Sequence, residues 1–111
     1  MTIDDQVRAY ADEAGTLYWD DHDLPQALDR LLPGIRLATE ADRLDLAKPL
    51  CYNVASFCWP GWPDREEVIT ADQLKIGESY ANENLRLAVE LKRTDAGMAN
   101  AHFLVGAYHF T

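Results

Sequence analysis

Two ten-residue segments of this chain carry the same pattern of side chains, and this repetition limits the possible folds more than any other feature. Residues 50–59 and 101–110 each have an aromatic residue third, a valine and a small residue in the middle, and two aromatic residues near the end. Repetition within one chain is typical of proteins whose units stack on one another to bury a shared core. We therefore expect a layered stack.

The units are predicted to be helical, because apolar residues recur at helical intervals and strand signals are almost absent. The predicted helices cover residues 4–19, 23–38, 44–59, 70–93 and 96–110. Asp23 with Gln26, and Thr70 with Gln73, have the spacing of capping boxes that begin a helix. Pro33-Gly34 should kink or break the second helix, because proline removes a backbone donor and clashes with the preceding turn.

Spacing within and between the helices resembles that of the tetratricopeptide repeat. The first helix of that repeat has a bulky residue, then Leu-Gly three and four residues later, then Tyr three further on. The corresponding residues are Ala11, Ala14-Gly15 and Tyr18; Cys51, Val54-Ala55 and Cys58; and His102, Val105-Gly106 and His109. The second helix of the repeat has Ala, a bulky residue four later and a small one three later, matched by Ala27, Leu31, Gly34 and by Ala81, Leu85, Ala88. The family's Trp and closing Pro are absent.

This resemblance implies an all-α, right-handed helical-repeat array of about five helices in a single domain, residues 1–111. The first repeat would cover about 4–39, and the second about 44–93 with an inserted loop at 60–69. The first helix of a third repeat would cover about 96–110. Gly15, Ala55 and Gly106 are predicted to mark the places where helices approach most closely.

The last helix has no successor within these residues, so a stack should leave part of its apolar surface open. Leu104, Val105 and Tyr108 are the predicted members of that surface. A second copy of the chain, giving a homodimer through the last helix, is the favoured cover. The alternative is that the chain is a fragment of a longer array.

Charge restricts the class of partner. The chain has 19 acidic and 10 basic residues, a net charge of -9. This charge repels phosphate backbones and anionic lipids, so we expect a basic or apolar protein or peptide as partner, and neither nucleic acid nor a membrane. The N-terminus lacks the layout of a signal peptide, and Cys51 and Cys58 are too far apart along one helix for a disulfide, so a cytoplasmic location is expected.

Two clusters invite a metal-site interpretation. Cys51, Cys58, His102 and His109 form a valid zinc ligand set, but a spacing of seven residues separates each pair by two helical turns. Their repeat positions face the core, so packing explains them better than metal. The segment 20–23, Asp-Asp-His-Asp, is interpreted as a solvated turn. We expect no metal, no cofactor and, in the absence of a catalytic motif, no enzymatic activity.

The most distinctive local sequence is Trp59-Pro60-Gly61-Trp62-Pro63, whose prolines and glycine end the third helix. It has two interpretations. Trp59 and Trp62 fold back and cover the helix ends, or they overhang a groove and hold a ligand, since tryptophan is a frequent binding anchor.

The predicted function is a protein-interaction module, because in tetratricopeptide arrays the first helices of the pairs line a groove that holds a peptide or a partner helix. The predicted groove residues are Asp12, Trp19, Tyr52, Asn53, Ser56, Trp59, Trp62, Asn100, Phe103 and Phe110. Tyr52 and Trp59 have an alternative role as extensions of the core. The alternative function is a small-molecule binder or enzyme with a pocket under the Trp-Pro-Gly-Trp loop.

Overall fold

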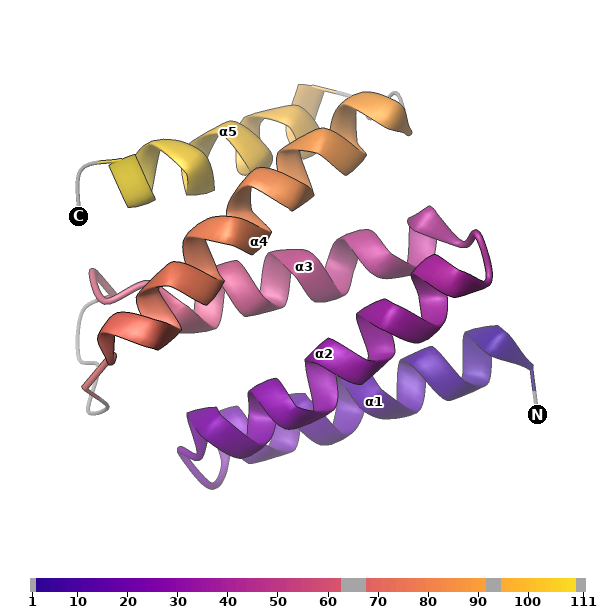
Figure 1. Ribbon diagram of the computed structural model, residues 1–111, viewed down its shortest axis with the longest axis horizontal. Helices are drawn as coiled ribbons and strands as arrows, with labels where there is room; N and C mark the ends of the chain where they lie inside the picture. Colours follow the sequence, from indigo (N-terminus) through magenta and orange to yellow (C-terminus); the bar gives the residue numbers. More distant parts are fainter. Residues whose placement is uncertain (1, 63–67, 92–94, 110–111) are drawn as a thin grey trace.

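The computed structural model describes residues 2–62, 68–91 and 95–109, and for residues 95–97, 99 and 100 it describes the backbone alone. These residues form five helices and no strand (Figure 1): α1 (Ile3–Trp19), α2 (Leu24–Glu40), α3 (Leu44–Cys58), α4 (Ala71–Glu90) and α5 (Asp95–His109). None of the described helices combines the length and the apolar character that crossing a bilayer requires.

Short polar motifs begin the helices, as predicted. The Asp23 carboxylate accepts hydrogen bonds from the Gln26 amide nitrogen at 3.1 Å and from Gln26 Nε2 at 2.6 Å. Thr70 and Gln73 form a full capping box, in which the Gln73 amide donates to Thr70 Oγ1 at 3.1 Å and the Thr70 amide donates to Gln73 Oε1 at 2.9 Å. Each motif satisfies amide groups that a helix leaves without an internal partner.

Pro33-Gly34 was expected to kink or break the second helix, and the break does not occur. α2 runs through Pro33 as one helix from Leu24 to Glu40. Leu31, Gly34 and Ile35 on either side of the proline are all buried. Packing on both sides of Pro33 therefore outweighs the loss of one backbone hydrogen bond, as tertiary contacts often override local propensity.

The helices form a layered stack. Each helix packs on the next along the chain, α1 also approaches α3, and α3 also approaches α5, whereas among the described residues the backbones of α2 and α4, and those of α1 and α5, do not come close together. In Figure 1, α2 and α4 lie toward the viewer and α1, α3 and α5 lie behind them. This arrangement is a two-layered array of helix pairs and not a bundle closed around one axis.

The burial pattern corrects the predicted register of the second unit. α2 buries Ala27, Leu31, Gly34 and Ala38, and α4 buries Gly77, Ala81, Asn84 and Ala88 at the same spacing. The pattern therefore repeats after fifty residues, one turn away from the predicted match of Ala27 with Ala81. The same shift relates three buried residues of α3 to three of α5: Cys51, Val54 and Cys58 correspond to Ala101, Leu104 and Tyr108.

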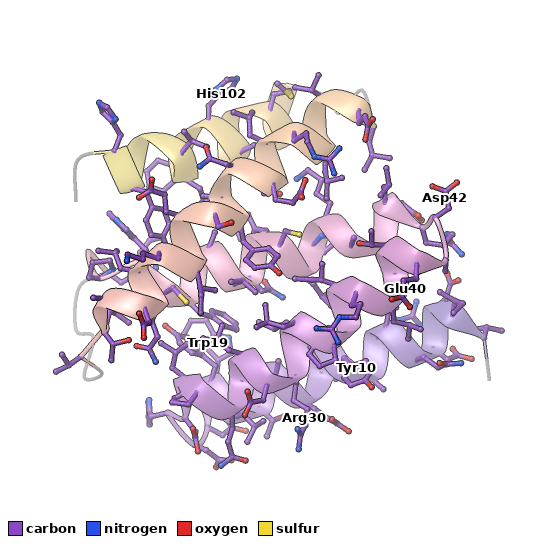
Figure 2. All side chains as sticks on the ribbon, viewed as in Figure 1. Tyr10, Trp19, Arg30, Glu40, Asp42 and His102 are labelled. Atoms are coloured by element: carbon purple, nitrogen blue, oxygen red, sulfur yellow. The ribbon has the colours of Figure 1, made fainter. Side chains whose placement is uncertain are left out.

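This shift also corrects the histidines. His102 and His109 were predicted to face the core, but both side chains are exposed, and His102 points away from the stack in Figure 2. The predicted repeat position in α5 is off by one residue. Leu104 and Tyr108, predicted to lie on an open apolar surface, are buried, and Val105 is half-buried. They form the contact of α5 with the stack.

Close approach between helices occurs at different glycines from those predicted. Ala55 is fully buried, but a Cβ on Gly15 or Gly106 would meet no atom within 4 Å outside its own helix. Gly34 and Gly77 are the tight positions. A Cβ on Gly34 would lie 2.7 Å from Leu50 Cδ2, and one on Gly77 would lie 2.6 Å from Cys58 Cβ and would overlap the Tyr108 hydroxyl. The tight crossings therefore belong to α2 and α4.

Candidate interaction surface

The predicted groove residues that the structure describes belong to α1, α3 and α5 and to the segment that follows α3. We call the outer side of this layer, away from α2 and α4, the odd-helix face. Two large aromatic side chains are exposed along these helices, Trp19 at 67% and Phe103 at 55%. Asp12 is also exposed, and its seven-residue spacing from Trp19 places the two side chains on one side of α1, two turns apart.

Trp19 lies against a stacked aromatic pair that joins α1 to α3. The Tyr18 and Phe57 rings are parallel within 4°, with centroids 3.9 Å apart, and both side chains are buried. Trp19 meets them edge-on, with centroids 4.8 Å from Tyr18 and 6.2 Å from Phe57. Figure 2 shows Trp19 reaching from the end of α1 toward the end of α3. The pair supports one edge of Trp19 and leaves most of the indole exposed to solvent.

A second aromatic group joins the end of α3 to α5. The Trp59 ring meets Trp62 edge-on at a centroid distance of 4.7 Å and Phe103 at 6.2 Å. Trp59 and Tyr52 are half-buried and pack against the cluster of Ala55, Ala81, Leu104 and Tyr108. Tyr52 and Trp59 therefore extend the core, which is the alternative role predicted for them, while part of each side chain remains accessible.

The last turn of α3 is capped by two aromatic donors. Tyr108 of α5 donates its hydroxyl hydrogen to the Ala55 carbonyl oxygen at 2.5 Å, and Trp62 Nε1 donates to the Ser56 carbonyl oxygen at 2.7 Å. Carbonyl groups in the last turn of a helix have no amide partner within that helix. The loop tryptophan thus folds back onto the helix end, which is the structural interpretation of the Trp-Pro-Gly-Trp segment.

The remaining predicted residues are placed as follows. Asn53 and Ser56 are half-buried on α3. The Asn100 side chain and Phe110 lie outside the described residues, as do Pro63 and the charged residues 64–67 of the loop.

An ion network ties the start of α1 to the start of α3. Arg43 donates to Asp4 Oδ1 at 2.8 Å and to Asp45 Oδ2 at 2.9 Å. The hydrogen bond from Arg43 holds the pKa of Asp45 below its ordinary value, and the bonds to Asp45 and Asp4 raise the pKa of Arg43. Asp45 is therefore ionised at neutral pH.

The cysteines lie in the core and not at a reactive site. Cys51 and Cys58 are not joined in a disulfide, and both side chains are fully buried. Burial raises the pKa of the Cys51 thiol to about 12, so it is neutral at physiological pH and a poor nucleophile. Within the described residues, no group of three or more His, Cys, Asp or Glu side chains could hold a metal ion.

Two features were not predicted from the sequence. A pocket of about 130 Å³ lies between α4 and α5, lined by Glu78, Ala81, Asn82, Val105, Tyr108 and His109. Asn84 is fully buried, and within the described part of the chain neither its Oδ1 nor its Nδ2 has a hydrogen-bond partner. The sequence did contain an indication of the pocket, because α4 has polar residues at positions where α2 has leucines. The incorrect alignment of α2 with α4 concealed this difference.

Comparisons with protein-family profiles, with curated proteins and with solved structures gave no match for this chain. The resemblance to tetratricopeptide repeats therefore rests on the spacing of the residues, and the function rests on the geometry described above.

Proposed function

We propose that this chain is a protein-interaction module, a tetratricopeptide-like scaffold that binds an extended peptide or a partner helix on the odd-helix face. The observation that carries the proposal is the exposure of Trp19 and Phe103 on two helices of the same layer, each supported by ring contacts with residues in or just after α3. Exposed aromatic side chains with rigid support are typical anchors of binding surfaces, because little conformational entropy is lost when a partner covers them.

A basic or apolar segment fits this surface best. The chain carries a net charge of -9, and Asp12 is exposed on α1 beside Trp19. A partner with Lys or Arg beside an apolar residue would gain Coulomb attraction as well as apolar contact, whereas an acidic partner would be repelled. A cytoplasmic location belongs to the same proposal. The homodimer through α5 does not, because Leu104 and Tyr108 are buried against the stack and two copies would each bring a net charge of -9 to the contact. Sedimentation at several protein concentrations tests this.

The test selects peptides from a display library on the immobilised chain and then measures the binding of a selected peptide to variants. Trp19→Ser combined with Phe103→Ser should weaken binding at least about tenfold, because a buried aromatic anchor typically contributes 2 kcal/mol or more. These side chains are better targets than Tyr52 and Trp59, whose replacement would disturb the core.

The matched control is Val68→Ser combined with Val89→Ser, which also removes two exposed apolar side chains, at 88% and 61% exposure. The control should bind the selected peptide as the unmodified chain does. Equal losses in both double variants, or enrichment of acidic peptides, would refute the proposal.

The alternative function, a small-molecule pocket under the Trp-Pro-Gly-Trp loop, loses its main argument. Trp62 is hydrogen-bonded to the end of α3, and the pocket described above lies between α4 and α5 instead.

A further inference from the structure

The pocket between α4 and α5 occupies a definite place in the repeated architecture. Under the shift of fifty residues, its α4 residues Glu78, Ala81 and Asn82 correspond to three leucines of α2: Leu28, Leu31 and Leu32. Its α5 residues Val105, Tyr108 and His109 correspond to Ala55, Cys58 and Trp59. The pocket is therefore the second copy of a crevice that lies between α2 and α3.

In the first copy, α4 covers that crevice. Gly77 lies directly on Cys58, and Ile76 and Tyr80 pack against the core cluster that contains Leu28 and Leu31. Burial raises the pKa of the Tyr80 phenol, and the groups near enough to act on it include Arg36 of α2 and the thiol of Cys51 of α3. α4 thus places two side chains, four residues apart, over the seam between α2 and α3.

No described helix holds the equivalent position on α4 and α5. Ala81 and Tyr108 are buried at the floor of the pocket, while Glu78, Asn82 and His109 are exposed around it. The leucine positions of α2 have become a carboxylate, a small residue and an amide. Such a lining suits a cover that associates and separates, because polar groups at a contact remain hydrated when the cover leaves.

We propose that this pocket is the docking site for a helix of a partner protein, seated on α4 and α5 as α4 is seated on α2 and α3. A small residue of the partner helix would lie over Tyr108, and Lys or Arg at the positions of Ile76 and Tyr80 would face Glu78 and Asn82. Charge selects a basic partner over a second copy of this chain, because two copies would each bring a net charge of -9 to the contact. The site is separate from the odd-helix face, since Phe103 and Tyr108 are five residues apart on α5 and point to different sides.

The test uses two synthetic peptides of residues 71–90, which retain Gly77 and Ala81 at the close contact. The basic peptide carries Ile76→Lys and Tyr80→Lys, and the acidic peptide carries Ile76→Glu and Tyr80→Glu. Fluorescence anisotropy at low ionic strength should show that the full chain binds the basic peptide and not the acidic one. Glu78→Lys in the full chain should weaken the basic peptide at least about tenfold and allow the acidic peptide to bind.

A Glu78→Lys variant that failed to fold could not gain affinity for the acidic peptide. A change of preference from the basic to the acidic peptide therefore tests the site itself. Glu40→Lys is the control: Glu40 is exposed at the end of α2 (Figure 2), and the variant changes the net charge by the same amount. Glu40→Lys should leave both affinities unchanged. Three outcomes would each overturn the proposal. The first is equal weakening by Glu40→Lys, and the second is no binding of the basic peptide up to millimolar concentration. The third is that the peptide shifts the backbone amide NMR signals of Trp19 and Phe103 in place of those of Glu78 and Val105.

Discussion

The α1–α3 and α4–α5 regions are built on one helical pattern but are held together by cores of very different size. A continuous cluster of leucines, alanines and aromatic residues joins α1, α2 and α3, includes Leu31 and Phe57, and also takes in Leu87 of α4. Among the described residues, the buried cluster that holds α5 consists of Ala55, Ala81, Leu104 and Tyr108. Tyr108 is the largest side chain of this cluster, so its contacts are the ones to test in the second region.

The two regions also fill the same buried position differently. Gly34 of α2 leaves room for Leu50, whereas the equivalent residue of α4 is Asn84, a fully buried amide without a hydrogen-bond partner among the described side chains. Leu50 corresponds by the fifty-residue shift to Asn100, whose side chain lies outside the described residues. At this position the first region therefore buries an apolar contact and the second region buries an amide.

The largest expected effect comes from the tight crossing of the second region. Gly77→Ala places a Cβ against Cys58 Cβ and the Tyr108 hydroxyl, so it should lower the free energy of unfolding by about 1–3 kcal/mol. Urea denaturation measures this change. Gly106→Ala and Gly15→Ala are matched controls in helices with open space, and they should raise stability by about 0.5–1 kcal/mol. If Gly77→Ala left the free energy of unfolding unchanged, α4 and α5 would not be packed as closely as the structure shows.

Removing one hydroxyl tests the cap on α3. Tyr108→Phe keeps the ring but leaves the Ala55 carbonyl without its donor, and it should cost about 1–2 kcal/mol of unfolding free energy. Tyr10→Phe, on a half-buried ring of the first region, is the control and should change stability little. If thermal unfolding shows the two variants to be alike, the bond from Tyr108 contributes nothing to the second region.

Replacing the buried amide of Asn84 by an apolar side chain should make the packing of the second region more like that of the first. Asn84→Leu replaces a buried amide that has no partner among the described side chains by an apolar side chain of similar volume, and we expect a gain of about 1 kcal/mol in unfolding free energy. Asn82→Leu, at an exposed position of the same helix, should stay within about 0.5 kcal/mol of the unmodified chain. A loss of stability in Asn84→Leu would show that the amide has a partner, such as a bound water.

The smallest effect concerns the first region and depends on pH. The Asp45 carboxyl has a lowered pKa, so its bond with Arg43 stabilises the fold above its ordinary value of 3.8 and is lost as pH falls through the lower folded value. Arg43→Met should therefore lower the melting temperature slightly at pH 7, and the difference should disappear at strongly acidic pH. A difference that persists in acid would mean that Arg43 acts through packing.

Local signals in the sequence predicted local structure well. The capping motifs at Asp23 and Thr70 predicted where α2 and α4 begin, because a cap needs only residues three apart. Pro33 misled the prediction, because the buried residues on either side stabilise the helix from outside it. The glycine crossings and the register of α5 were also wrong: they depend on how whole helices sit against each other, and small residues alone do not specify this.

The same distinction holds for the candidate surface. The exposure of Trp19 and Phe103 could be predicted from helical spacing. Tyr52 and Trp59 are half-buried because they pack with residues of α5, and this contact could not be predicted from α3 alone. The pocket between α4 and α5 could not be predicted from the sequence. Its polar lining is recognised only when the structure shows which residues of α4 correspond to the leucines of α2.

The cap on α3 has a consequence for the order of assembly. The donor to Ala55 comes from Tyr108, 53 residues further along the chain, and the donor to Ser56 comes from beyond the helix end. During synthesis on a ribosome, the Ala55 carbonyl therefore lacks its donor until α5 docks, whereas the Ser56 carbonyl also accepts from the neighbouring Trp59 amide at 3.4 Å. Solvent must hydrate the Ala55 carbonyl in the interval, so this turn gains its last hydrogen bond late although it lies in the middle of the chain.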